Sequence, residues 1–220
     1  MEFTWDRVEC GGQRRHCGEN NSQVAWSRWT GITPEDLQHE GASIDARMTT
    51  DSGEMRCVGQ VHDDQLRGSY SFKENPEFAR RMEAMGFGGQ TPDRLRDYAF
   101  LDVTTAWVGQ LKDLHVTGMN EQNLMGLRAL KVDAAYVRAM AADGYPELAA
   151  DKLTSMKAVG VTPEKVKAVR AMGYSPSEEE LIQMSVFKID APFVERMKAR
   201  GFKNLTIAQL VQIKVFKLDE

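Results

Sequence analysis

The feature that most constrains this sequence is a pattern that recurs about every 29 residues through its second half. A small residue or histidine followed by a large apolar residue marks each repeat, at Gly86, His115, Gly144, Gly173 and Gly201. These positions are 29, 29, 29 and 28 residues apart, and two apolar registers that begin at Leu95 and Val103 keep nearly the same spacing. Self-similarity of this length is typical of repeat proteins, in which each unit is one small supersecondary structure.

Each repeat divides into two short stretches with the composition of α-helices. Thr162 and Asp190 are expected to cap the second stretch, which then carries valine and methionine on one face. The glycine is expected to end this helix in a left-handed conformation, and the next aromatic residue (Tyr145, Tyr174, Phe202) to pack back against it. A hairpin of fewer than about 30 residues cannot bury its own apolar face, so the pattern predicts a curved α-solenoid of stacked hairpins.

Before residue 75 the pattern changes to an alternation of polar and apolar residues, which is typical of β-strands. Three antiparallel strands are expected, at residues 44–48, 55–61 and 66–72, with turns at 51–53 and 62–64. Three strands are few for an independent sheet, so residues 3–5 and 24–26 are expected to add strands.

The same part contains one expected helical turn, at residues 33–37, and three tryptophans. Trp5, Trp26 and Trp29 are assigned to a core in preference to a ligand groove, because a sheet this small needs large apolar side chains. The sequence therefore predicts an α+β protein. An antiparallel β-meander domain spans residues 1–74, and a helical-hairpin repeat domain spans residues 75–220.

The cysteines Cys10, Cys17 and Cys57 all lie in the β-rich part. Cys10 and Cys17 bracket a short polar loop that can close as a disulfide, which an oxidising compartment would favour. Cys57 lies within a strand pattern, where a buried and inert thiol is usual. The alternative is a metal site in which Cys10, His16 and Cys17 are joined by His62 or Cys57, although only the adjacent His16 and Cys17 are close in sequence.

Other chemistry is sparse. A Cys–His nucleophilic site built on His39 or His62 is a weaker alternative, because no motif fixes its geometry. The sequence has no phosphate-binding loop, dinucleotide fingerprint, HExxH or GxSxG motif, so no catalytic residue and no cofactor is predicted.

Composition narrows the class of partner and the compartment. Residues before Gly86 include 10 basic and 15 acidic side chains, and those from Gly86 onward include 18 and 17, which argues against nucleic acid as a partner. No apolar run approaches the roughly 18 residues of a membrane span. The opening MEFTWDRVEC lacks the basic start and apolar stretch of a secretory signal.

The last repeat departs from the pattern. Its segment 207–218, IAQLVQIKVFKL, is apolar on more than one side, so we expect something to cover it. A homodimer contact, further chain beyond this sequence or the groove of a partner would each do so. The candidate interaction surface consists of Val211, Val215, Phe216 and Leu218.

Three segments in order, GSYSF, NPEFARRMEAMGF and GVTPEKVKAVRAMGY, resemble a group of bacterial envelope proteins. In that group a strand of the form GxFxF leads to NPxF and then to repeats like GVTPEFIRELRALGY. The resemblance covers about residues 48–220 and is most specific at residues 160–174. Such repeats occur in exported proteins without an assigned role and downstream of membrane metallopeptidases of the beta-lactam-sensor type. The resemblance implies an exported, periplasmic location and a non-catalytic accessory role.

The sequence therefore predicts a non-catalytic binding or interaction module of the bacterial cell envelope, which contacts a protein or an envelope component through a solenoid surface. The alternative is a metal-binding sensor or a metal-dependent enzyme, with its site at His16 and Cys17 in the N-terminal β part.

Overall fold

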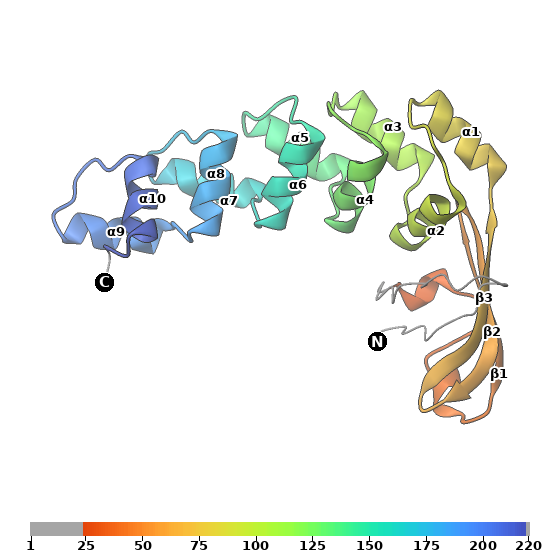
Figure 1. Cartoon of the computed structure of the whole chain (residues 1–220). Helices are drawn as coiled ribbons and strands as arrows, with labels where there is room; N and C mark the ends of the chain where they lie inside the picture. The colour runs from red at the N-terminus through yellow and green to blue at the C-terminus, as the bar shows by residue number, and fades with distance from the viewer. Residues whose placement is uncertain (1–23, 219–220) are drawn as a thin grey trace. The chain divides into compact units, whose positions relative to one another are not determined.

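Figure 1 shows the computed structural model, which describes residues 24–218. Within these residues a three-stranded antiparallel sheet is followed by ten α-helices, so the α+β class is confirmed. The contacts divide the chain into two compact units, Met1–Val108 and Gly109–Glu220. The division falls within α3 (Thr105–Asp113), whereas the sequence pattern changes at residue 75.

The sheet consists of β1 (Ser43–Thr50), β2 (Gly53–His62) and β3 (Gln65–Glu74), in the order β1-β2-β3. Alternate residues of β1 and β2 point into the core, as the period-two pattern predicts. Each strand is longer than its apolar segment, because the paired backbone hydrogen bonds continue to the turns at both ends of β2. The predicted meander is confirmed.

The expectation that residues 24–26 add a strand is wrong. The chain instead forms a 3₁₀ turn, η1 (Trp26–Arg28), and touches the sheet through one isolated bridge between Thr30 and Arg47. A second turn, η2 (Asp36–Gln38), confirms the predicted helical turn. The other expected strand, residues 3–5, lies outside the described residues.

Arg28, the last residue of this 3₁₀ turn, joins the segment to a helix. Its guanidinium donates to the carbonyl oxygens of Ala99 at 2.6 Å and Phe100 at 2.8 Å, at the end of α2 (Pro92–Leu101). A cation is favourable there because the last carbonyls of a helix lack partners within it. Since α2 also contacts β2 and β3, this helix belongs to the core of the sheet unit. Trp29, which is 6% exposed, lies in that core as expected.

The ten described helices are short, at nine or ten residues each. Besides α2 and α3 they are α1 (Pro76–Ala84), α4 (Glu121–Ala129), α5 (Ala134–Ala142), α6 (Ala150–Ala158), α7 (Pro163–Ala171), α8 (Glu178–Val186), α9 (Ala191–Ala199) and α10 (Ile207–Val215). Side chains cap most of them, and the predicted caps Thr162 and Asp190 accept hydrogen bonds from Lys165 N and Phe193 N. None of these helices has the length and apolarity needed to cross a bilayer.

Every described helix ends in the same way. One residue near its end adopts a left-handed conformation, and the following N–H donates to the carbonyl five residues earlier, which is the Schellman arrangement. The predicted left-handed glycines at 144, 173 and 201 are confirmed, and Gly86 ends α1 in the same way, with φ between 86° and 92° at these four positions. The other helices end at Gly160 and at five left-handed residues that carry a Cβ, which are Asp102, His115, Lys131, Lys188 and Lys217.

Within the second unit, helices two apart in the sequence pack together. Helix α4 contacts α6, α6 contacts α8, α8 contacts α10, and α5 contacts α7 (Figure 1). Each contributes apolar side chains three residues apart that are at most 7% exposed: Leu124 and Leu127, Val137 and Met140, Leu153 and Met156, Val166 and Val169, Leu181 and Met184, Leu210 and Ile213. The assignment of the leucine, valine and methionine stripes to the core is confirmed.

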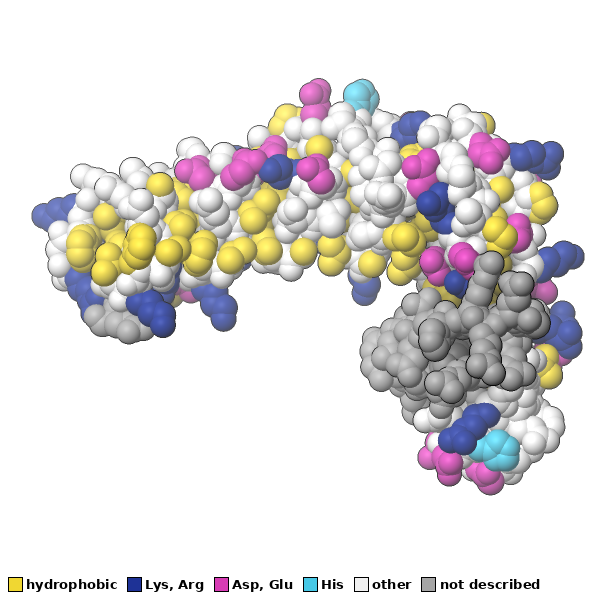
Figure 2. Space-filling view, in the orientation of Figure 1, with side chains coloured by type: hydrophobic (Ala, Val, Ile, Leu, Met, Phe, Trp, Pro, Cys, Tyr) yellow, Lys and Arg dark blue, Asp and Glu magenta, His cyan; other side chains and the backbone are white. Residues whose placement is uncertain are grey.

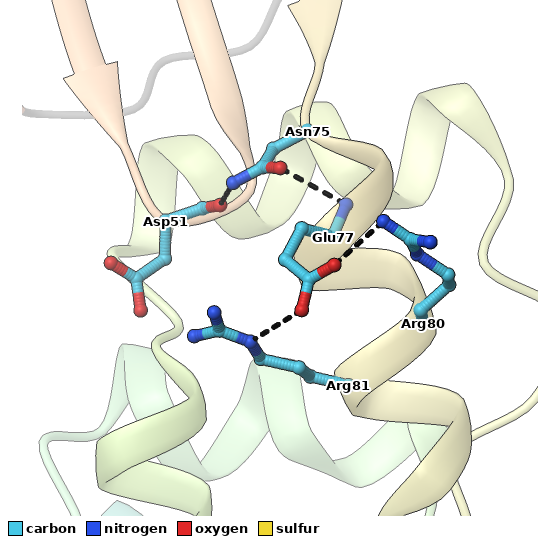
Figure 3. A network of polar contacts seen from close by, with 5 residues as sticks. All are labelled: Asp51, Asn75, Glu77, Arg80 and Arg81. Atoms are coloured by element: carbon cyan, nitrogen blue, oxygen red, sulfur yellow. Dashed lines mark hydrogen bonds and ion pairs between the residues drawn. The ribbon is translucent and has the colours of Figure 1, made fainter.

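The junction between the sheet and the first helix depends on Asn75 (Figure 3). Its side-chain oxygen accepts from Glu77 N at 3.1 Å, which caps α1. Its amide nitrogen donates to Asp51 O at 2.8 Å, in the turn between β1 and β2. Glu77 in turn pairs with Arg80 and Arg81 on the surface of α1. One side chain therefore both starts the helix and fixes it to the sheet turn.

We expect Asn75→Ala to lower the free energy of unfolding by about 1–2 kcal/mol, because it removes the helix cap and the bond to the turn. Asn75→Asp retains an acceptor for Glu77 N but loses the donor, so we expect an intermediate loss. Urea denaturation of the full chain followed by circular dichroism measures both. Equal urea midpoints for Asn75→Ala and the wild type would contradict this role.

Candidate interaction surface

The residue that follows each left-handed helix end is apolar, and we call it the closing residue. Its backbone N–H makes the five-residue hydrogen bond, and its side chain can pack on the helix that it closes. In the described chain seven closing residues are buried: Phe87, Val103, Val116, Val132, Tyr145, Val161 and Ile189. Tyr174 is half-buried, whereas Phe202 is 46% and Leu218 63% exposed. Exposure of closing residues is therefore confined to the last two helices.

The exposed closing residues lie beside the surface expected from the sequence. Helix α10 buries Ile207, Leu210 and Ile213 on one face. The helix ends with Val215 and Phe216, which are 51% and 68% exposed, and Val211 is half-buried. We define the C-terminal patch as Phe202, Val215, Phe216 and Leu218. Figure 2 shows hydrophobic side chains gathered over α9 and α10, with lysine and arginine side chains beside them.

A pocket adjoins this patch. It has a volume of about 320 Å³ and lies between the end of α7, the helix α9 and the loop that leads into α10. Its lining includes Tyr174, Val194, Lys198, Phe202, Leu205 and Leu210. The expectation that Phe202 packs back as Tyr145 does is wrong, because its ring borders this pocket and is 46% exposed.

Tyrosine hydroxyls make a contact that Phe202 cannot make. Tyr145 Oη donates to Pro176 O at 2.6 Å, and Tyr174 Oη donates to Leu205 O at 3.1 Å. Each bond joins a closing residue to the carbonyl 31 residues later, just before the start of a helix. Phe202 has no hydroxyl, and it is the closing residue of the last hairpin described. The sequence shows this change of tyrosine to phenylalanine, but the pattern alone does not reveal the exposure.

The charge around the pocket is positive. Residues 186–218 include seven basic and two acidic side chains, whereas residues 158–185 include three and four. Both acidic groups are engaged within the segment, since Asp190 caps α9 and Glu195 pairs with Lys198 at 2.7 Å. The hydrogen bond to Glu195 raises the pKa of Lys198, so this amine at the pocket is charged at neutral pH.

The residues of the alternative metal site are only partly described. Cys10, His16 and Cys17 lie outside the described residues, and so does their predicted disulfide or metal site. His62 Nδ1 lies 2.8 Å from Glu40 Oε1 at the end of β2, and this contact lowers the pKa of Glu40. Residues 24–218 contain no group of three or more His, Cys, Asp or Glu side chains that could hold a metal ion.

His39 and Cys57 are the remaining candidates for a nucleophilic or metal site in the sheet unit. His39 Nδ1 lies 3.0 Å from Glu35 O, at the turn η2. Cys57 is 1% exposed within β2, and burial raises its pKa to about 12. Because the thiolate is the reactive form, a thiol with this pKa is a poor nucleophile at neutral pH. Cys57 is therefore a core residue, as its strand pattern predicts.

We expect Cys57 to resist alkylation by iodoacetamide at pH 8 in the native protein, at least about 100-fold more slowly than in 6 M guanidinium chloride. Peptide mass spectrometry of the full chain measures the labelling at each cysteine. The unfolded sample provides the control, since it exposes the same thiol. If the predicted disulfide forms, Cys10 and Cys17 stay unlabelled there until a reductant is added. Rapid native labelling of Cys57 would contradict its burial.

The geometry thus brings together an exposed apolar patch, a pocket and a positive charge on the last two helices, and places the thiol and imidazole candidates elsewhere. Comparison of the chain with protein-family models, with curated proteins and with solved structures finds no match.

Proposed function

We propose that this chain is a non-catalytic binding module of the bacterial cell envelope. Its helical hairpins form an α-solenoid with a period of about 29 residues, and the last hairpin presents a surface to a protein or another envelope component. The exported, periplasmic location follows from the resemblance of residues 48–220 to envelope proteins with GVTPEFIRELRALGY-type repeats.

Two observations support the solenoid. The first helices of successive hairpins begin at Pro92, Glu121, Ala150, Glu178 and Ile207, which are 29, 29, 28 and 29 residues apart. In the second unit, helices α4, α6, α8 and α10 contact one another in succession. Such a stack shares its core between neighbours, and it offers an extended surface with few constraints on the exposed residues.

The exposure of Phe202 and Leu218 is the observation that carries the proposed binding role. Of the eight equivalent closing residues of earlier helices, seven are buried and Tyr174 is half-buried, so the last two helices present apolar groups that the fold elsewhere covers in large part. Val215 and Phe216 are also large, apolar and exposed, so the last two described helices and their ends present four such side chains. Exposed apolar side chains that gather beside charged residues are typical of interaction sites.

A binding assay on the patch tests this proposal. We expect the immobilised full chain to retain a component of bacterial envelope extract or to self-associate in light scattering. The double variant Phe216→Ser/Leu218→Ser should weaken that interaction at least about tenfold. Val58→Thr is the matched control, because it removes exposed apolar surface on β2, where Val58 is 42% exposed. A monomer that retains nothing, or equal retention by the double variant, would refute the proposal.

A further inference from the structure

The pocket beside Phe202 differs from the equivalent place one hairpin earlier. There the guanidinium carbon of Arg170 lies 5.7 Å from the centre of the Tyr145 ring, and one of its nitrogens lies within about 3 Å of where a side chain on Gly144 would begin. Arg170 therefore covers Gly144 and the ring of Tyr145. In the last hairpin Lys198 takes the helical position of Arg170, eighth in α9 as Arg170 is eighth in α7.

Lysine does not fill this place as arginine does. The Lys198 amine bonds to Glu195 on its own helix, one turn away, and Tyr174 and Gly173 line an open pocket. A guanidinium is a flat group that stacks on aromatic rings, whereas an ammonium is a compact, strongly hydrated charge. The pocket is thus a local consequence of lysine in place of arginine and of its pairing with Glu195.

The pocket has room for one large side chain. Its volume of about 320 Å³ is near the lower end of known ligand pockets, at roughly 300–1,000 Å³. Val194, Phe202, Leu205 and Leu210 line it together with Asn204 and the charged Lys198, so the pocket offers both apolar and polar groups. A concave site of this kind admits a protruding side chain, which a flat lipid surface or a phosphate backbone does not supply.

The basic residues near the pocket indicate which residues would flank the bound side chain in a partner. Lys198 lines the pocket, Arg200 and Lys203 are close to its lining residues in sequence, and all three residues are exposed. The first turn of α10 has no acidic residue, whereas α8 opens with three glutamates. Like charges repel, so a second copy of this basic surface would be disfavoured, and an acidic partner would be attracted.

We propose that the pocket binds an acidic peptide segment of a partner protein, with a leucine, methionine or aromatic side chain in the pocket and carboxylates beside Lys198, Arg200 and Lys203. This inference rests on the proposed binding function and specifies its partner. The exposed ion pair of Lys198 with Glu195 contributes little stability, so a peptide carboxylate can replace Glu195 at little cost.

Selection of random twelve-residue peptides displayed on phage against the immobilised full chain tests the partner class. We expect the enriched peptides to share one large apolar residue flanked by aspartate or glutamate. Affinity of a synthetic selected peptide should fall at least about tenfold in Phe202→Ala, and should fall as NaCl rises from 50 to 500 mM. Enrichment without acidic residues, or no enrichment, would overturn the proposal.

Lys198→Arg tests the pocket without changing the net charge. We expect the arginine to cover Gly173 and Tyr174, as Arg170 covers Gly144 and Tyr145, and so to weaken peptide binding about tenfold. The melting temperature should be unchanged. Lys188→Arg, on an exposed residue that does not line the pocket, is the matched control. Equal peptide affinity in Lys198→Arg and the wild type would overturn the assignment of the pocket.

Three competition outcomes separate this inference from the proposed function. Equal displacement of the peptide by phosphatidylglycerol vesicles, by duplex DNA or by a second copy of the chain would replace the acidic peptide with that occupant, and so overturn the inference. Loss of envelope binding in Phe216→Ser/Leu218→Ser, with normal peptide affinity in Phe202→Ala, would leave the proposed function standing and overturn only the pocket.

Discussion

Short helices impose the constraint on which this structure depends. A nine-residue α-helix is about 13 Å long, and it is marginal in water because its own hydrogen bonds barely offset the cost of ordering the chain. Its apolar residues, such as Leu153 and Met156 of α6, become buried only when another helix covers them. The contacts that join α4, α6, α8 and α10 in succession are therefore a condition for each helix to form.

The Schellman motif at each helix end lets a short connection lead from one helix to the next, so that the same packing can recur along the chain. A left-handed residue reverses the chain at the end of every described helix, and the closing residue then lies against the last turn. Glycine adopts this conformation without steric cost, but Asp102, Lys131, Lys188 and Lys217 adopt it as well. The hydrogen bond and the buried closing side chain offset the strain of a residue with a Cβ, except at Lys217, where Leu218 is largely exposed. That exception lies in the C-terminal patch.

The proposed interaction surface consists of the same kinds of apolar residue that form the core in earlier hairpins. In the earlier hairpins the elements that follow cover the helix end, through contacts such as the bond from Tyr145 Oη to Pro176 O. On the last two helices Phe202 and Leu218 present the same chemistry to solvent. Residues 196–218 include lysine and arginine and no acidic residue, so apolar groups and positive charge occur together in this part of the chain.

The sequence by itself determined the secondary structure, because helix caps, left-handed glycines and apolar periodicity act within a few residues of one another. It therefore predicted the three strands, the starts of the helices at Thr162 and Asp190, and the buried state of Cys57. Only the tertiary structure decided which apolar residues stay exposed, since burial depends on neighbours distant in the chain. For that reason the sequence pattern wrongly predicts that Phe202 packs back on its helix and that residues 24–26 form a strand, and it does not predict the pocket beside Lys198.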